Sequence, residues 1–594
     1  MVGRYLAVHW PSAMPDGGTA RRSVRNAERL LGLTDIHQRP GFALMVEAGV
    51  DVLKAASGRT TVIGTLFPQH GESNGIVEVD QETSHAIESS RGDRLITGYW
   101  GSYVAFVTEK DSGALHVIRD PSGSVSAYTA TNGEVTYFAS DPEMLVSLGI
   151  ADGKLDWPSL AHHICYPLLR NGRTCLLGVD AVLPGMALTL QPDGSRSERY
   201  PWNPWDYARG DQQIENMDEA IEAVSFETRR CALALASQSN HILLELSGGL
   251  DSSIVAACLR KTTAELSLVT LMSAEPGSDE RRYARIVAES IGAPLHEIML
   301  QTTPGDILRL PKARSAFPDQ SLLHQIMNDA LSQHAAAINA DSFFSGGGGD
   351  NVFCYLGTAS PAADVLRKSG FSRNFYTAVS ELADLYRSTI WTAARYAVRK
   401  ALWAKPIFAR REIALLAQEA IPSAPLLHHW FNRPPGSLPG KLEHLISIAY
   451  GQWATDSSQR AQFAALRYPL LAQPLVQTCL RIPTWMWIAQ GRNRSIARDA
   501  FKDDLPREIL QRRSKGDFVG FVGEMYKQNA SIIREVLLDG HLARAGLLDR
   551  DAVEKSLAAP TQPGGTAFNR LLTLARPGIW AESWIQGRSP MPAT

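Results

Sequence analysis

Short apolar runs broken by polar turns dominate the first third of the chain. Hydrophobic and β-branched residues gather over 60–66, 103–107 and 115–118, and glycine, aspartate, asparagine and serine separate these runs. This pattern is typical of strands joined by tight turns, as in the turn sequences DPSG (120–123) and TNGE (131–134). Many closely spaced strands predict a β-sandwich over this part of the chain.

The spacing of apolar positions changes after a stretch rich in proline, tryptophan and charge at 196–214, which we interpret as a linker. Helix-like and strand-like segments alternate beyond it, and from about residue 355 the pattern is mainly helical. The expected helices are Met217–Gln238, Ser252–Lys261, Asp279–Ile291 and Leu322–Ala340, and the expected strands are His241–Leu246, Leu266–Leu271 and 295–300. Alternation of this kind predicts an α/β unit with a parallel sheet. We therefore expect a β-rich domain over 1–205 and an α/β domain with extra helices over 206–594.

Composition and charge narrow the class of protein. The 594 residues are 44% hydrophobic and 20% charged, which is ordinary for a soluble protein of several domains. The 59 basic and 61 acidic residues lack the basic excess of a general nucleic-acid binder, so we expect no nucleic-acid partner. The N-terminus lacks the features of a signal peptide and no apolar run is long enough to span a bilayer, so we expect a cytoplasmic protein without a membrane partner. Six cysteines without a CxxC spacing are expected to be buried and unpaired.

The segment SGGLDSS (247–253) ends an expected strand and opens an expected helix. Gly248 and Gly249 allow positive φ and a close approach of backbone N–H groups to an anion. The helix N-terminus adds further N–H donors, and Ser247, Ser252 and Ser253 add hydroxyls. This pattern predicts a phosphate-binding loop, although a glycine-rich turn with a serine cap is the simpler alternative.

A second loop with the same character weakens that alternative. The segment SGGGGD (345–350) also follows an apolar run and ends in Asp350, as the first loop contains Asp251. In a parallel sheet the two loops face each other, so both carboxylates are candidates to bind one Mg²⁺ that bridges phosphates. Neither loop is a Walker A loop, because no lysine follows the glycines.

These segments, taken with others in the same order, resemble the asparagine synthetase family. The synthetase-domain resemblance rests on SGGLDSS, SDERRYARIVAESIGAPLHEI (278–298), FSGGGGDNVF (344–353), ALRYPLLAQPLVQTCLRIP (465–483) and ARDAFKDDLPREILQRRSKGDF (497–518). The segment 119–145 is similar to the glutaminase domain of that family. The resemblance implies an Ntn-hydrolase-like glutaminase domain followed by a synthetase domain of the adenine-nucleotide α-hydrolase type.

The resemblance also implies a chemistry. ATP and Mg²⁺ would bind on the glycine loops, a substrate carboxylate would be adenylated with release of pyrophosphate, and an amine would then displace AMP. Lys515 falls where related synthetases keep a lysine near the pyrophosphate, so it is the expected electrostatic catalyst beside Asp251 and Asp350. Ser345 and Gly346 are expected to contact the nucleotide, and Thr270 and Leu271 to border the adenine.

Two departures from the family redirect the expected function. Val2 stands where a working glutaminase of this class has its N-terminal cysteine nucleophile, so the first domain is expected to be inactive. Gly347 stands where the asparagine-forming branch has a glutamate and the β-lactam-forming branch a tyrosine, and we interpret the four glycines as room for a bulky substrate. A degenerate glutaminase domain with intact loops resembles the lasso peptide macrolactam synthetases. That branch implies a precursor peptide substrate, a leader peptidase and a leader-recognition protein.

Several alternatives stay open at this point. An asparagine synthetase that uses free ammonia, a β-lactam-type synthetase and a non-catalytic scaffold remain candidates. The general base for the amine is not identifiable, because Glu443 and His444 fit a helix surface or a buried core histidine equally well. Glu245 precedes the first loop where an apolar residue is expected, and it faces either the adenine edge or an arginine.

Overall fold

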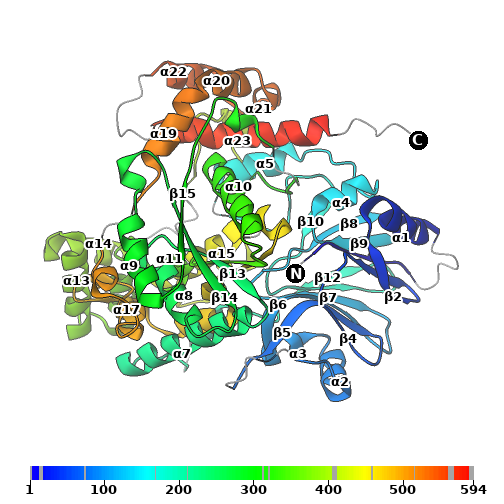
Figure 1. The fold of residues 1–594 in the computed structure, drawn as a ribbon, viewed down its shortest axis with the longest axis horizontal. Helices are drawn as coiled ribbons and strands as arrows, with labels where there is room; N and C mark the ends of the chain where they lie inside the picture. The colour runs from blue at the N-terminus through cyan, green and yellow to red at the C-terminus, as the bar shows by residue number, and fades with distance from the viewer. Residues whose placement is uncertain are drawn as a thin grey trace.

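A computed structural model shows how the chain is arranged (Figure 1). It describes residues 3–11, 18–71, 75, 77–167, 169–209, 212–310, 314–318, 321–403, 411–455, 459–513, 516–559 and 567–587. The described residues form an α/β fold, with two antiparallel sheets in the N-terminal part and a parallel sheet in the C-terminal part.

The N-terminal part contains two six-stranded antiparallel sheets. One has the order β10-β8-β9-β1-β3-β2, and the other has the order β12-β11-β7-β6-β5-β4. The strands are β1 (Tyr5–His9), β2 (Thr34–Arg39), β3 (Phe42–Val46), β4 (Val52–Lys54), β5 (Thr60–Pro68), β6 (Tyr99–Thr108), β7 (Leu115–Arg119), β8 (Tyr128–Asn132), β9 (Val135–Ala139), β10 (Val179–Ala181), β11 (Ala187–Leu190) and β12 (Arg196–Arg199). The predicted sandwich over this part of the chain is confirmed.

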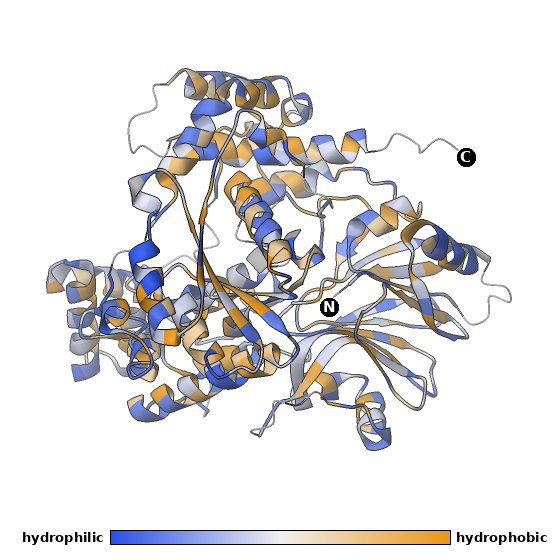
Figure 2. Cartoon of the chain, in the orientation of Figure 1, coloured by the Kyte–Doolittle hydropathy of each residue, from blue (hydrophilic) through white to orange (hydrophobic). Residues whose placement is uncertain are grey.

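Both faces of these sheets are covered. Alternate residues of β1 separate the two sides: Tyr5 and Ala7 pack into the core between the sheets, and Leu6 and Val8 pack into the neighbouring core. Helices α1 (Gly18–Leu31) and α4 (Pro142–Ser147) lie against the first sheet, whereas α2 (Gln81–Ser89) and α3 (Asp93–Gly98) lie against the second (Figure 1). Hydrophobic colour runs along the strands, and α1 is mainly hydrophilic (Figure 2).

The C-terminal part is built on a five-stranded parallel sheet with the order β15-β14-β13-β16-β17. Its strands are β13 (His241–Glu245), β14 (Glu265–Met272), β15 (Leu295–Met299), β16 (Ser342–Ser345) and β17 (Ala465–Arg467). The helices of this part include α7 (Met217–Ala236), α8 (Leu250–Leu259), α9 (Arg281–Ile291), α10 (Leu322–Ala337), α11 (Gly349–Val352), α12 (Ser360–Ser369), α13 (Arg373–Tyr386), α14 (Ile390–Trp403), α15 (Pro439–Thr455), α16 (Gln473–Arg481), α17 (Ser495–Ala500), α18 (Arg507–Leu510), α19 (Val519–Gln528), α20 (Ala530–Leu538), α21 (His541–Arg544), α22 (Arg550–Ala558) and α23 (Ala567–Gln586). The predicted alternation of helices and strands is confirmed, and no predicted boundary is shifted by more than three residues.

The predicted linker is wrong over 196–208. Arg196–Arg199 forms β12, and Trp205–Ala208 forms the short helix α6. Trp202 and Trp205 are each 1% exposed, and Trp205 Nε1 donates to the Trp430 carbonyl at 2.7 Å. Proline and tryptophan mark this stretch because it is packed between the two parts of the molecule.

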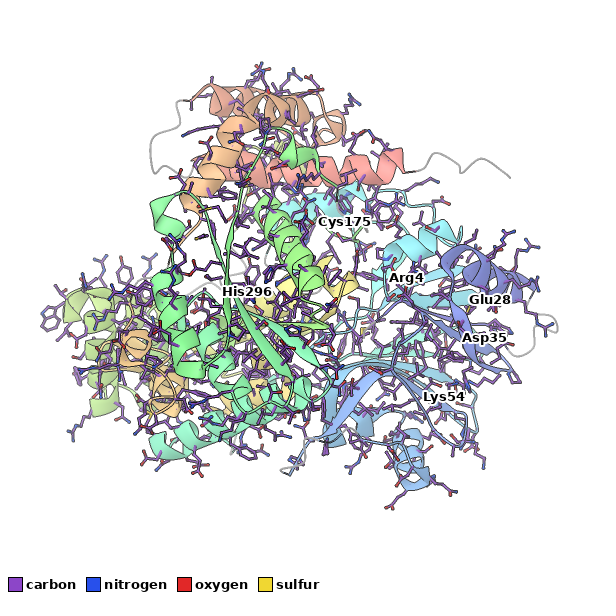
Figure 3. The ribbon with its side chains drawn as sticks, in the orientation of Figure 1. Arg4, Glu28, Asp35, Lys54, Cys175 and His296 are labelled. Carbon is purple, nitrogen blue, oxygen red and sulfur yellow. The ribbon has the colours of Figure 1, made fainter. Side chains whose placement is uncertain are left out.

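Buried polar bonds join the two parts. Arg230 of α7 donates to the carbonyls of Pro68 and Gln69 at 3.1 and 3.2 Å, and Gln69 Nε2 donates to Gln477 Oε1 at 2.8 Å. Cys175, labelled in Figure 3, lies at the same boundary, where its N–H donates to the Ala316 carbonyl at 3.1 Å. The six cysteines are buried and form no disulfide, as predicted. Within the described ranges, no helix is both long enough and apolar enough to cross a membrane.

Candidate active site

A cavity of about 570 Å³ opens at the carboxyl edge of the parallel sheet. Glu245, the last residue of β13, lies in register with Ser345, the last residue of β16, so the loops that follow these strands start side by side. Both loops line the cavity, together with residues 491–494 and 509–513. Open α/β sheets bind their ligands at this edge.

The first loop has the backbone of an anion site. Gly248 has a φ of +66°, and a Cβ at this position would lie 2.5 Å from the Cβ of Tyr283, so no larger residue fits without a shift. Helix α8 begins at Leu250 with Gly249 as its N-cap and without a side-chain cap. Because Gly249 and Leu250 both line the cavity, the N–H groups of the first helical turn lie at its wall.

The predicted nucleotide contacts from this loop separate into two groups. Ser247, Gly249, Asp251 and Ser252 are among the cavity-lining residues, and Gly248 shapes the turn behind them. Ser253 is fully buried, and its hydroxyl donates to the Gly249 carbonyl at 2.7 Å. Ser253 therefore stabilises the first turn of α8 from inside and does not line the cavity.

The predicted adenine border on β14 also lies outside the cavity. Thr270 is 1% exposed and Leu271 is 8% exposed, and neither is a lining residue. Both residues sit in a strand that is covered on both faces, as parallel strands usually are, so their side chains stay in the core. Ser345 and Gly346, from the second loop, do line the cavity as predicted.

Crowding explains the glycines of the second loop. A Cβ at Gly346 would lie 2.4 Å from the backbone nitrogen of Ser252, and a Cβ at Gly347 would lie 2.9 Å from Cε1 of Tyr468. The interpretation of these glycines as room for a bulky substrate is therefore wrong. They allow the second loop to press against the first loop and against a tyrosine ring.

The two predicted carboxylates converge on one guanidinium. Nη1 of Arg494 lies 2.8 Å from Oδ2 of Asp251 and 2.5 Å from Oδ1 of Asp350. Asp251 lies in the first turn of α8 and Asp350 in the first turn of α11. Burial opposes the charge of Arg494, but the two carboxylates outweigh it and raise the pKa of this arginine above its ordinary value.

This geometry fits a divalent cation. Because Asp251 and Asp350 reach a single nitrogen atom, their oxygens can also reach a single metal ion placed between them. Among the described residues, no group of three His, Cys, Asp or Glu side chains could hold a metal. Two carboxylates with phosphate and water oxygens are the usual ligands of Mg²⁺ at phosphate sites, so the donor set matches the predicted metal.

Cationic side chains surround the far wall of the cavity. Arg512 is tightly held: its Nη1 donates to the Gly248 carbonyl at 3.0 Å, it forms an ion pair with Glu280, and it stacks 3.9 Å above the ring of Tyr283. It therefore positions the first loop, and Arg513 lines the cavity beside it. Lys515, the predicted electrostatic catalyst, lies outside the described residues, as does Val2.

The orientation of Glu245 is settled in favour of an arginine. Arg460 Nη1 lies 3.1 Å from Glu245 Oε2, and the arginine side chain is only 9% exposed. Glu245 also lines the cavity. The Glu245 carboxylate therefore lies at the cavity wall at the end of β13, and Arg460 neutralises its charge.

The two candidates for a general base are structural. Glu443 pairs with Lys400 and accepts a hydrogen bond from the Thr358 hydroxyl at 2.7 Å. His444 is fully buried with Nε2 2.9 Å from the Val352 carbonyl, and burial lowers its pKa to about 3. Neither residue lines the cavity.

Sequence reasoning missed several lining residues, among them Arg494, Tyr355 and Tyr386. Arg494 is an N-cap with a φ of 51°, directly after the short hairpin of β18 (Ile488–Ala489) and β19 (Arg492–Asn493). The turn at Gly491 and the basic pair that follows it are the only local signals. Those signals are common at surface turns, so they do not point to a site.

Comparison with known proteins places these loops in a family context. The sequence model of the family described as asparagine synthase matches residues 235–586, which include both glycine loops and the cationic wall. A carboxyethyl-arginine β-lactam synthase of Streptomyces clavuligerus is 25% identical over 301 residues, covering 50% of this chain and 49% of that protein. A glutamine-hydrolysing asparagine synthetase of Bacillus subtilis is 23% identical over 224 residues, covering 37% of this chain and 34% of that protein. The alignments thus span half or less of each relative.

Solved structures add less. The allosteric regulatory enzyme of purine biosynthesis and the B. subtilis glutamine phosphoribosylpyrophosphate amidotransferase, solved with ADP and GMP, are each 11% identical to this chain. Each match covers 50% of this chain and 74% or 75% of the other, with a TM-score of 0.20. A score of this size does not establish a shared fold.

Proposed function

This chain belongs to the asparagine synthase family, and we propose that it is an ATP-dependent, AMP-forming amide ligase. The observation that carries the proposal is the convergence of Asp251 and Asp350, from two glycine loops, on one point of the cavity wall. Backbone N–H groups of α8 and the arginines beside them provide positive potential for a triphosphate on the same wall.

The chemistry follows from these groups. A carboxylate oxygen of the substrate attacks the α-phosphorus of ATP, the bond to the bridging oxygen breaks, and pyrophosphate leaves with that electron pair. The amine nitrogen then attacks the acyl carbon, AMP leaves, and the nitrogen loses one proton to solvent or phosphate. Mg²⁺ held by Asp251 and Asp350 would neutralise charge on the phosphates. Arg494 and Arg513 would hold the departing pyrophosphate, and Lys515 is proposed to act with them.

The finer proposal concerns the substrate. We propose that the carboxylate is an Asp or Glu side chain of a precursor peptide and that the amine is the N-terminus of the same peptide, so that a macrolactam ring closes. The support for it is that Gly347 carries neither the glutamate nor the tyrosine side chain that the resemblance implies for the asparagine-forming and β-lactam-forming branches. A leader peptidase and a leader-recognition protein are the partners that this proposal implies. The N-terminal sheets would stabilise the synthetase part through the Arg230 and Gln69 bonds.

A β-lactam-forming ligase is the second candidate. Its support is the S. clavuligerus relative, which is 25% identical over half of this chain. Both candidates close a ring within one molecule after adenylation, so they differ only in the substrate. Gly347 weighs against this candidate, because the resemblance implies a tyrosine at this position for that branch and a glycine stands there in this chain.

One experiment separates the candidates. The purified protein with ATP and Mg²⁺ is given aspartate with ammonium, carboxyethyl-arginine, or a synthetic peptide with an N-terminal glycine and an internal Asp or Glu, and pyrophosphate release and product mass are measured. We expect release only with the peptide, with a product lighter by one water. Release with aspartate or carboxyethyl-arginine would refute the peptide assignment, and absence of ATP binding would favour a scaffold.

Matched variants connect the result to the site. Asp251→Asn and Asp350→Asn are each expected to abolish pyrophosphate release with an unchanged circular dichroism spectrum. Asp503→Asn, an exposed aspartate outside the cavity, serves as the control and is expected to keep wild-type activity. Activity retained in either loop variant would remove the basis of the metal assignment.

A further inference from the structure

Helices α13 and α14 carry large apolar side chains on their outer surface. Trp391 is 84% exposed and Trp403 is 72% exposed, whereas Trp100, Trp430 and Trp487 are buried. Other exposed side chains of this region are Phe371, Tyr376, Tyr386, Ile390, Tyr396 and Leu402. Scattered exposed hydrophobic residues are normal, but a group of aromatic residues on one helical pair marks an interaction surface.

The arrangement within α14 is the reverse of an ordinary surface helix. Its buried positions are the small residues Ala393 and Ala397, which pack with α12 and α13 around a core that includes Phe375. Its tryptophans point outward. A helix that only covers a core buries its largest apolar residues, so the outer face of α14 is built to contact another molecule.

This surface is continuous with the active-site cavity. Leu385 and Tyr386 at the end of α13 line the cavity, and every residue from 386 to 392 is exposed. Five residues of extended chain span at most about 18 Å, so Trp391 lies within that distance of the cavity wall at Tyr386. In Figure 1, α13 and α14 lie on the same side as α11 and α17, away from the N-terminal sheets.

The charge of the surface indicates what it binds. Helix α14 has three basic residues, Arg395, Arg399 and Lys400, and no acidic residue. Lys400 is neutralised by Glu443, but Arg395 and Arg399 are exposed between the aromatic side chains. Arginine beside tryptophan favours a partner that has both carboxylates and apolar side chains.

We propose that the outer face of α14 and the turn 386–392 bind the part of the peptide substrate that remains outside the cavity. The inference rests on the proposed function: a peptide whose carboxylate enters the cavity can leave it past Tyr386, which both lines the cavity and is exposed. The reactive Asp or Glu side chain would enter the cavity, and the C-terminal carboxylate of the same peptide would stay outside it, which matches the two exposed arginines. The apolar side chains next to its reactive residues would pack on Trp391 and Trp403.

The test measures peptide binding apart from catalysis. Trp391→Ala, Trp403→Ala and Arg395→Glu are made in the full-length protein, and Phe226→Ala, an aromatic residue 46% exposed on α7, is the matched control. Fluorescence anisotropy of a labelled synthetic peptide with an N-terminal glycine and an internal Asp or Glu is recorded without ATP, and the KM values for peptide and ATP are determined separately. We expect Trp391→Ala, Trp403→Ala and Arg395→Glu each to weaken peptide binding and to raise the KM for the peptide roughly tenfold, as loss of an aromatic or arginine anchor does. The KM for ATP should stay unchanged.

Other outcomes overturn the inference in distinguishable ways. If the wild-type protein cyclises the peptide, and the α14 variants have the same peptide affinity and KM as Phe226→Ala, the surface is not the peptide site and the proposed function stands. If the wild-type protein releases no pyrophosphate and does not bind the peptide, the proposed function fails as well. If the protein sediments with phosphatidylglycerol vesicles and Trp391→Ala abolishes this, the face binds a membrane. If the protein is a dimer that Trp391→Ala dissociates, the face binds a second copy of the chain.

Discussion

The bridge from Arg494 to Asp251 and Asp350 leads to a quantitative prediction for Arg494→Met. Since the carboxylate oxygens lie 2.8 and 2.5 Å from the same nitrogen, they are no more than about 5 Å apart. Two like charges at that separation repel by about 3 kcal/mol at an effective dielectric constant near 20. The Asp350 side chain is 36% exposed, so solvent screening reduces this to about 1–2 kcal/mol.

In the wild-type protein Arg494 relieves this repulsion. Mg²⁺ must therefore compete with the Arg494 guanidinium for the carboxylate oxygens of Asp251 and Asp350. In Arg494→Met the repulsion remains until Mg²⁺ binds, so we expect the nucleotide-free variant to bind Mg²⁺ roughly tenfold more tightly. We expect it to be less stable than the wild-type protein in EDTA and to regain stability with Mg²⁺. Pyrophosphate formation is expected to fall, because the phosphates lose a cationic partner.

Isothermal titration with MgCl₂ measures the affinity, and thermal unfolding with and without EDTA measures the stability. The control is Arg492→Met, which removes a neighbouring lining arginine that pairs with Asp499 at 3.6 Å. Its Mg²⁺ affinity should stay at the wild-type value. Unchanged or weaker Mg²⁺ binding by Arg494→Met would refute the idea that the guanidinium competes with the metal.

Three further predictions concern the loops and the core. Gly346→Ala places a Cβ 2.4 Å from the Ser252 nitrogen, so it should separate the loops and weaken binding of a fluorescent ATP analogue at least tenfold; unaltered binding would contradict the crowding argument. Arg460→Met leaves Glu245 unpaired and should cost about 1–2 kcal/mol in urea unfolding, which Glu245→Gln should largely restore in the double variant. Burial lowers the pKa of His444 to about 3 while the unfolded chain takes up a proton near 6.5, so stability should be lost as the pH falls from about 6.5 toward 3. A melting temperature equal at about pH 7.5 and pH 5 would argue against this last point.

Local patterns were sufficient for the elements and for the two loops. The alternation of apolar runs with turn residues predicted β5, β6 and β7, because the apolar run of each strand and the turn residues that bound it are neighbours in the sequence. Helix α10 and strand β14 followed from the same kind of short-range spacing. Glycine-rich turns after two strands predicted that Asp251 and Asp350 meet, since parallel strands end at one edge.

Contacts between distant segments were not predictable in the same way. Ser253 and Asp251 are two residues apart in one loop, yet one is buried and the other lines the cavity, because the turn of α8 points them in different directions. The four glycines were interpreted from the sequence as room for a substrate, and only the positions of Ser252 and Tyr468 show that the loop is crowded instead. The positions of Thr270 and Leu271 at the end of an apolar run did not show that both faces of β14 are covered.

The sequence by itself determined the two-part α/β architecture, the paired glycine loops and the carboxylates that end at one sheet edge, because these depend on neighbours along the chain. The tertiary structure alone decided that Arg494 bridges those carboxylates, that Arg460 neutralises Glu245, and that the tryptophans of α14 face outward beside the cavity. Each of these contacts joins residues far apart in the chain or depends on which face of a helix is covered. Such pairings are set by the packing of whole elements and leave no periodic signal in either partner.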